Sequence, residues 1–169
     1  ETASGAYPLE AVRTMDKIVR TTEREDRYWR EHTDLDLGHT TNAIARAAVT
    51  CSRSLPDTRA IITYTISGGV ARLVSDYRPR VPIIALTPNP ATYQSLAMYW
   101  GVTPVQFTLS SAEGRSIFQD IDRLLLGQGL FARGDRVVIT LGFPLKDQKS
   151  VNLLKIHQVG ESLPAAPTS

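Results

Sequence analysis

The chain has 169 residues, of which 42% are hydrophobic and 21% are charged, and its formal net charge is +2. This length predicts one main domain with a substantial core, and the small net charge excludes the basic excess typical of nucleic-acid-binding proteins. No run approaches the ~20 apolar residues of a membrane-spanning helix, so we expect neither a nucleic acid nor a membrane as a partner. The single cysteine, Cys51, cannot form an internal disulfide, which favours a reducing, cytoplasmic location.

The N-terminal part is predicted to form one amphipathic helix. Pro8 suits a first helical turn, and apolar residues recur after it at helical spacing, at Leu9, Val12, Met15, Ile18 and Val19. Residues 1–21 are therefore predicted to be a terminal helix outside the main domain. The chain begins at Glu1 rather than at methionine, which we interpret as the sign of a piece from a longer protein.

The charge-dense residues 22–39 are predicted to be a linker. They include side chains of types that can ligate a metal ion, namely His32, Asp34, Asp36 and His39. Their spacing matches no metal-binding motif, and we interpret them as a polar, solvated connection.

Residues 40–160 have the alternating periods of an α/β domain. The first helix is predicted over 40–55, with Thr40 or Thr41 as its N-cap. The residues of this helix that are expected to face the core are Ile44, Ala47, Ala48 and Cys51. Strands are predicted at 60–64, 83–87, 103–107, 136–141 and 153–159, and further helices at 69–77, 90–100 and 112–126.

The last connection, over residues 142–152, is too short for a helical crossover, so the final strand is expected to run antiparallel at the sheet edge. The predicted fold class is α/β: a three-layer sandwich whose five-stranded, mostly parallel sheet has an antiparallel edge strand and helices on both faces. The residues over 161–169 are rich in proline, alanine and serine and are predicted to be a disordered tail.

The segment Thr65-Ile-Ser-Gly-Gly69 is the first candidate site. It joins an apolar strand to the start of a helix, where Thr65 and Ser67 supply hydroxyls and Gly68 and Gly69 allow close approach of a ligand to the backbone. This arrangement favours a phosphate ligand. The alternative is an ordinary strand-to-helix turn. The segment lacks the lysine of a P-loop and the spacing of a dinucleotide fingerprint.

The loop over 142–149 is the second candidate, because it carries Lys146 and Lys149. Ligands of open α/β sheets bind outside the carboxyl ends of the strands, where this loop and the Thr65 segment should both emerge. The two could therefore hold one ligand, although lysines in an exposed turn are commonly just solvated. We find no nucleophile elbow, no Cys/His pair and no carboxylate cluster with catalytic spacing.

Several segments, in one order along the chain, resemble the C-terminal part of pyruvate kinase. Residues 1–15 resemble the family's GETA-x-G-x-YP-x-EAV-x-x-M, residues 65–71 its T-x-SG-x-xA, and residues 77–87 its YRP-x-x-PI-x-A-x-T. Further matches in the same order are Gly101–Val105, Gly134–Asp135 and Asn152–Ile156. The resemblance implies the last helical segment of a catalytic barrel followed by the family's α/β domain.

The resemblance implies a parent enzyme of glycolysis that transfers a phosphoryl group from phosphoenolpyruvate to ADP, giving pyruvate and ATP, with Mg2+ and K+ and as a homotetramer. The catalytic groups of that family lie in barrel segments upstream of Glu1, so this chain alone is predicted to be inactive. The C-terminal domain is regulatory in many members. Carried over residue by residue, the resemblance assigns an effector phosphate to Thr65, Ser67, Gly68 and Gly69.

Departures from the family pattern narrow the range of phosphorylated ligands that we expect to bind. Ile66, Gly69, Val70 and Gln128 stand where members that bind fructose bisphosphate often carry basic or hydroxyl groups. Losing charged partners weakens the binding of a doubly phosphorylated ligand. We therefore expect a phosphorylated sugar or nucleotide with one phosphate. One alternative is a pure assembly module of the tetramer that binds no effector, and another is an independent small enzyme.

Overall fold

The computed structural model describes residues 2, 4–24, 39–110, 114–145 and 150–164, with the backbone alone for residues 114–116. Contacts divide the chain into two units, Glu1–Thr33 and Asp34–Ser169. Most of the predicted linker, including His32, Asp34 and Asp36, lies outside the described residues, as does most of the predicted tail. The predicted boundaries of these two segments therefore stay predictions.

The first unit contains helix α1, Pro8–Thr22. Pro8 stands in its first turn as expected, and Glu10 and Arg20 complement the helix dipole at the two ends. No residue of α1 is buried. Its apolar residues Leu9, Val12, Met15, Ile18 and Val19 each expose about half of their surface or more.

The second unit is built around one sheet of five strands in the order β3-β2-β1-β4-β5. β1 pairs in parallel with β2 and β4, and β2 pairs in parallel with β3. β5 is antiparallel to β4. The predicted fold class, including the antiparallel edge strand, is thereby confirmed. In chain order the elements are α2 Thr40–Ser54, β1 Thr58–Tyr64, α3 Gly69–Asp76, β2 Ile83–Thr87, α4 Pro90–Leu96, β3 Val102–Gln106, α5 Gly114–Gly127, β4 Arg136–Leu141 and β5 Leu153–Gln158.

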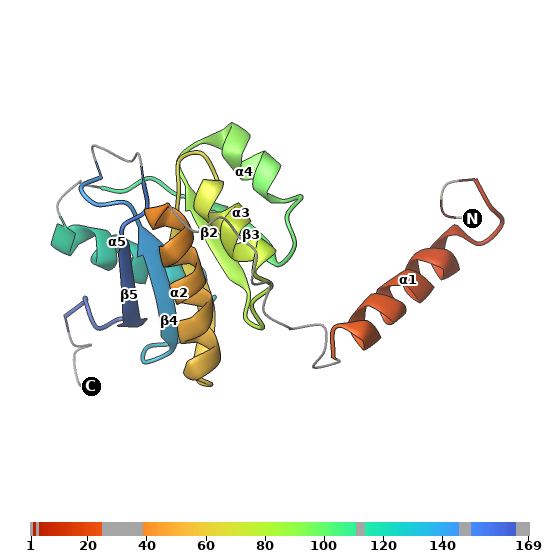
Figure 1. Cartoon of the computed structure of the whole chain (residues 1–169), viewed down its shortest axis with the longest axis horizontal. Helices are drawn as coiled ribbons and strands as arrows, with labels where there is room; N and C mark the ends of the chain where they lie inside the picture. The colour runs from red at the N-terminus through yellow and green to blue at the C-terminus, as the bar shows by residue number, and fades with distance from the viewer. Residues whose placement is uncertain (1, 3, 25–38, 111–113, 146–149, 165–169) are drawn as a thin grey trace. The chain divides into compact units, whose positions relative to one another are not determined.

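Helices cover both faces of this sheet. Alternate residues of β1 point to opposite faces, so Ile61 packs with α2 and α3 whereas Ile62 packs with α5. Figure 1 shows α2 crossing the sheet on the near side and α5 passing behind it. The central strands are buried on both faces, and all five residues of β2 are buried, which explains their continuous apolar runs.

Two details of the helices differ from the prediction. The N-cap of α2 is His39, and no side chain caps this end of the helix. Its buried residues are Asn42, Ala45, Ala48, Val49 and Ser52. Of the predicted core residues, Ala48 is buried and Cys51 packs against the core, whereas Ile44 and Ala47 are only partly buried. The most buried stripe is shifted toward Ala45, because small residues allow α2 to lie close to the sheet.

The predicted helix 90–100 ends early, at Leu96. Met98 and Tyr99 donate their amide protons to carbonyls only three residues back, those of Ser95 and Leu96. These tight turns lead into Gly101, whose φ of 67° belongs to the left-handed region that glycine favours. The chain therefore leaves the helix one turn sooner than the apolar pattern indicates.

Candidate functional site

A pocket of about 170 Å3 lies where β1 and β4 end. From β1 the chain moves outward to β2 and β3, and it then returns to β4 on the other side of β1. The carboxyl ends of β1 and β4 therefore form the topological switch point, which is where open α/β sheets bind ligands. The lining residues are Thr41, Tyr64, Thr65, Ile66, Ser67, Gly69, Val70, Gly142, Ser150 and Val151.

The turn from β1 into α3 is fixed by Thr65 and Gly68. The buried Thr65 accepts a hydrogen bond at Oγ1 from the backbone amide of Gly68, at 2.9 Å. Gly68 has a φ of 83° and is the N-cap of α3. A Cβ at this position would lie 3.1 Å from Cδ2 of Leu96. Both the backbone conformation and the packing therefore require glycine here.

The first turn of α3 supplies donors to the pocket. The amides of Gly69 and Val70 belong to the helical turn whose N–H groups have no partner within the helix, and both residues line the pocket. A Cβ on Gly69 would have Ser67 Oγ, at 3.7 Å, as its nearest neighbour. There is therefore free space beside Gly69 at the edge of the pocket, and the helix dipole favours an anion at the start of α3.

The opposite wall consists of the two ends of the β4–β5 connection. Asn152 joins these ends, because its side chain accepts from the amide of Phe143 at 2.7 Å and donates to the carbonyl of Phe143 at 2.6 Å. The amide of Val151 donates to Oγ1 of Thr41 at 3.0 Å. Thr41 thus brings the start of α2 to the pocket.

Three of the predicted site residues line the pocket together: Thr65, Ser67 and Gly69. Gly68 shapes the turn and is not among the lining residues. Lys146 and Lys149 lie outside the described residues. The lining residues that the sequence analysis did not predict as site residues are Thr41, Tyr64, Ile66, Val70, Gly142, Ser150 and Val151.

The charge of the described lining is low. It presents hydroxyls, backbone amides and apolar surface, and no charged side chain of the described residues lines the pocket. Tyr64 is buried at the inner wall, and burial raises the pKa of its hydroxyl, so that it remains neutral and protonated. Among the described residues, the groups that could meet an anion are therefore backbone amides, hydroxyls and the start of a helix dipole.

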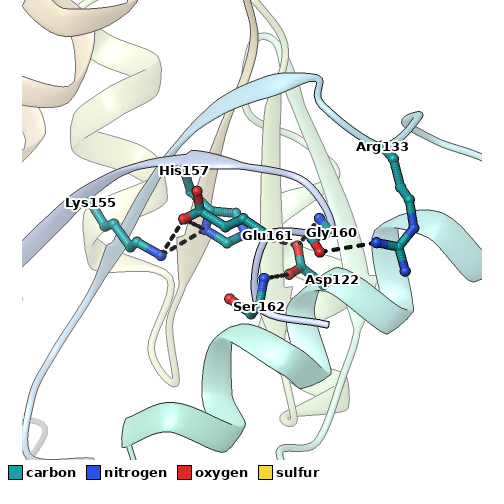
Figure 2. Close-up of polar contacts among 7 residues, drawn as sticks. All are labelled: Asp122, Arg133, Lys155, His157, Gly160, Glu161 and Ser162. Atoms are coloured by element: carbon teal, nitrogen blue, oxygen red, sulfur yellow. Dashed lines mark hydrogen bonds and ion pairs between the residues drawn. The ribbon is translucent and has the colours of Figure 1, made fainter. Parts of the chain in front are cut away.

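A second polar cluster joins α5 to β5 and to the turn that follows β5 (Figure 2). His157 and Asp122 are both fully buried, and Nε2 of His157 lies 2.7 Å from Oδ1 of Asp122. The amides of Gly160 and Ser162 also donate to Asp122, at 2.8 and 3.1 Å. One carboxylate therefore satisfies three donors, which fixes the turn after β5 on α5.

The outer side of this cluster is an ion pair. Nζ of Lys155 lies 2.6 Å from Oε1 of Glu161, and both atoms lie 2.8 Å from Nδ1 of His157. The hydrogen bond from Lys155 lowers the pKa of the Glu161 carboxyl. No residue of the pocket takes part in these contacts, and we interpret the cluster as one that stabilises the fold.

We expect the Glu161→Gln substitution to destabilise the fold near neutral pH but not in acid. A carboxyl whose pKa is lower in the folded than in the unfolded chain contributes stability above its unfolded pKa, and this contribution is lost as the pH falls through the folded pKa. The effect should be small because Glu161 is partly exposed. Urea denaturation of both proteins at a series of pH values, down to below the ordinary glutamate pKa of about 4.3, measures it. A difference that grows in acid would contradict the expectation.

Among the described residues, no group of three or more histidine, cysteine, aspartate and glutamate side chains is placed to hold a metal ion. None of the described helices has the length and apolar character needed to cross a membrane.

Comparison with known proteins identifies the domain. The family model described as pyruvate kinase, alpha/beta domain, matches residues 42–157. The chain is 36% identical over 162 residues to the pyruvate kinase of Clostridium acetobutylicum, covering 94% of this chain and 34% of that protein. It is also 36% identical over 170 residues to the pyruvate kinase of Geobacillus stearothermophilus, covering 96% of this chain and 28% of that protein.

A solved structure gives the same result. The fold resembles that of a pyruvate kinase from Cryptosporidium parvum with a TM-score of 0.75 and 29% identity, over 94% of this chain and 32% of that one. The chain spans about a third or less of the length of these relatives. Because the family model covers most of the chain, the resemblance seen in the sequence motifs is confirmed, and the chain belongs to the pyruvate kinase family, whose α/β domain it contains.

Proposed function

We propose that this chain is the C-terminal, regulatory part of a pyruvate kinase and that its pocket binds a phosphorylated sugar. The observation that carries the proposal is the pocket itself, which combines the open amides at the start of α3 with the hydroxyls of Thr65 and Ser67 at the switch point of the sheet. The whole enzyme would transfer a phosphoryl group from phosphoenolpyruvate to ADP, as a step of glycolysis in the cytoplasm.

The described lining favours a ligand with one phosphate. A phosphate bound at Gly69 and Val70 would receive backbone and hydroxyl hydrogen bonds but no charged partner from the described residues. Charge-assisted bonds contribute about 1.5–3 kcal/mol each, and we propose that Lys146 and Lys149, which lie outside the described residues, supply them to this one phosphate. A cavity of about 150 Å3 can hold a benzene ring. The pocket, at about 170 Å3, therefore suits a phosphate and part of a sugar ring, or a nucleoside monophosphate.

This chain alone should be catalytically silent. In the family that it belongs to, the catalytic groups and the sites for Mg2+ and K+ are expected in the barrel, so phosphoryl transfer requires parts outside this chain. The effector would act by favouring one arrangement of α/β domains in a homotetramer, and through it one geometry of the barrels. The effector can shift this equilibrium only if it binds the two arrangements with different affinities.

A second candidate function is assembly without an effector. It is favoured by the apolar Ile66 in the pocket lining, 41% exposed, where a basic residue would serve a phosphate better. In this alternative the domain would contribute only contacts between subunits, and the pocket would remain unused.

Calorimetric titration separates these functions. The chain is titrated with glucose 6-phosphate, ribose 5-phosphate, AMP and fructose 1,6-bisphosphate, and the titrations are repeated with the variant Ser67→Asp. Ser67 is exposed at the pocket, so the new carboxylate should leave the fold intact and repel a phosphate, weakening binding about tenfold or more.

The matched control is Ser54→Asp. Ser54 is exposed at the other end of α2, roughly 20 Å along the helix axis from Thr41, so the same change of charge should leave binding nearly unchanged. Equal weakening by the two variants would show a general charge effect and would contradict a site at Ser67. Absence of binding across the panel, by a folded chain, would favour assembly without an effector.

A further inference from the structure

The pocket has one wall that does not come from a connection of the sheet. Thr41 is the second residue of α2, the helix that follows residues 25–38 in the chain. Its Oγ1 accepts the amide of Val151, a residue 110 positions away, at 3.0 Å. Both Thr41 and Val151 line the pocket. The start of α2 is therefore attached to the β4–β5 connection by one hydrogen bond at the edge of the candidate effector site.

The geometry of this hydrogen bond leaves a donor available. A threonine hydroxyl has one donor hydrogen and can accept at its oxygen. The oxygen of Thr41 accepts from Val151, and among the described contacts its hydrogen is given to no acceptor. Thr41 is the second residue of α2 and His39 is its N-cap, so the Thr41 side chain is not occupied as a helix cap. Because Thr41 lines the pocket, its hydroxyl hydrogen is available to a ligand there.

We propose that Thr41 is a positioning residue that couples occupancy of the pocket to the first turn of α2. This inference rests on the proposed function. A phosphate or sugar oxygen in the pocket accepts from the Thr41 hydroxyl and completes a chain from the Val151 amide through Thr41 to the ligand. Hydrogen bonds in such a chain polarise and strengthen one another. A bound ligand therefore tightens the attachment of α2 to the β4–β5 connection.

The part of α2 that should respond to the ligand is its start, and the rest of the helix is held by other contacts. The turn that Thr41 begins continues into Asn42, whose Oδ1 accepts from the hydroxyl of Tyr77 at 3.1 Å. Ala45 and Ala48, farther along α2, are fully buried against the sheet. The later turns of α2 are therefore held by burial irrespective of the pocket, whereas in the first turn, where Asn42 is held by Tyr77, the ligand adds a second attachment through Thr41.

Amide hydrogen exchange of the 15N-labelled chain tests this coupling, with glucose 6-phosphate as the probe and inorganic phosphate as a second probe. Saturating probe should slow exchange at Gly69 and Val70, and also at Ala43 and Ile44 near the start of α2, by about tenfold or more. In Thr41→Val, which keeps the shape but removes the hydroxyl, Gly69 and Val70 should still be protected, whereas Ala43 and Ile44 should not.

Thr41→Ser, which keeps the hydroxyl, should restore protection in both regions, a rescue that loss of packing alone would not give. Protection of Ala43 and Ile44 that persists in Thr41→Val would overturn the coupling. Protection confined to Gly69 and Val70 in the unsubstituted chain would overturn the coupling and leave the proposed function standing. Absence of protection at Gly69 and Val70 with both probes would overturn the proposed function together with the coupling.

Discussion

Substitution of Asp122 by alanine is expected to lower the free energy of unfolding by about 3–5 kcal/mol. Asp122 is fully buried and accepts hydrogen bonds from His157, Gly160 and Ser162. Removing the carboxylate leaves three donors without their acceptor inside the protein, and an unpaired buried polar group costs its full desolvation penalty. A loss of this size is a large fraction of the ~5–15 kcal/mol by which domains are usually stable.

Urea denaturation followed by circular dichroism measures this loss. The matched control is Asp57→Ala, because Asp57 forms an ion pair with Arg136 but exposes 60% of its side chain. Exposed pairs contribute about 1 kcal/mol or less, so the control should be nearly as stable as the unsubstituted chain. Equal, small losses for the two variants would mean that the buried cluster does not fasten the turn after β5.

Gly68→Ala is expected to destabilise the domain by about 1–3 kcal/mol. Left-handed backbone costs a residue with a Cβ about 1–2 kcal/mol, and Gly68 has a φ of 83°. The new Cβ would also lie 3.1 Å from Cδ2 of Leu96, a fully buried side chain. The same substitution should weaken effector binding, because the Gly68 amide is held by Thr65 at the pocket.

Gly134→Ala separates the two causes. Gly134 has a similar φ of 89°, and a Cβ there would have no neighbour within 4 Å. Its destabilisation therefore reports the backbone strain alone, and the excess for Gly68→Ala reports the contact with Leu96. Thermal and urea denaturation of the two variants measures both values. An alanine at Gly68 that costs less than one at Gly134 would contradict the packing argument.

The fold could be predicted from the sequence because its signals are local. The apolar run of β1, bounded by the Thr65 turn, identifies a buried strand, and the short connection over 142–152 predicts an antiparallel last strand. The predicted core face of α2 is only partly correct, because Ala48 is buried and Cys51 packs against the core but Ile44 is only partly buried. Its pattern places bulky Ile44 inside, but close packing of a helix on a sheet selects small residues such as Ala45.

The candidate site was only partly predictable. Thr65, Ser67 and Gly69 belong to one continuous segment, and their types alone led to the prediction of a phosphate site, with an ordinary strand-to-helix turn as the alternative. Thr41 reaches the pocket through a contact with Val151, 110 positions away in the sequence. The sequence around Thr41 predicts a helix start with a capping residue, and nothing in it predicts this contact. The pairing of Asp122 with His157 joins residues 35 positions apart in no recognisable motif. Such contacts arise from the topology of the sheet.

Amide chemical shifts test most directly whether a phosphate binds in the pocket at the start of α3. Glucose 6-phosphate is added to the 15N-labelled chain, and backbone amide shifts are followed to saturation. We predict that the largest changes occur at Ser67, Gly69, Val70 and Val151, with little change at Gly134 at the other end of β4. Saturable changes centred outside the pocket, or none at these four amides in the folded chain, would contradict a phosphate site in this pocket.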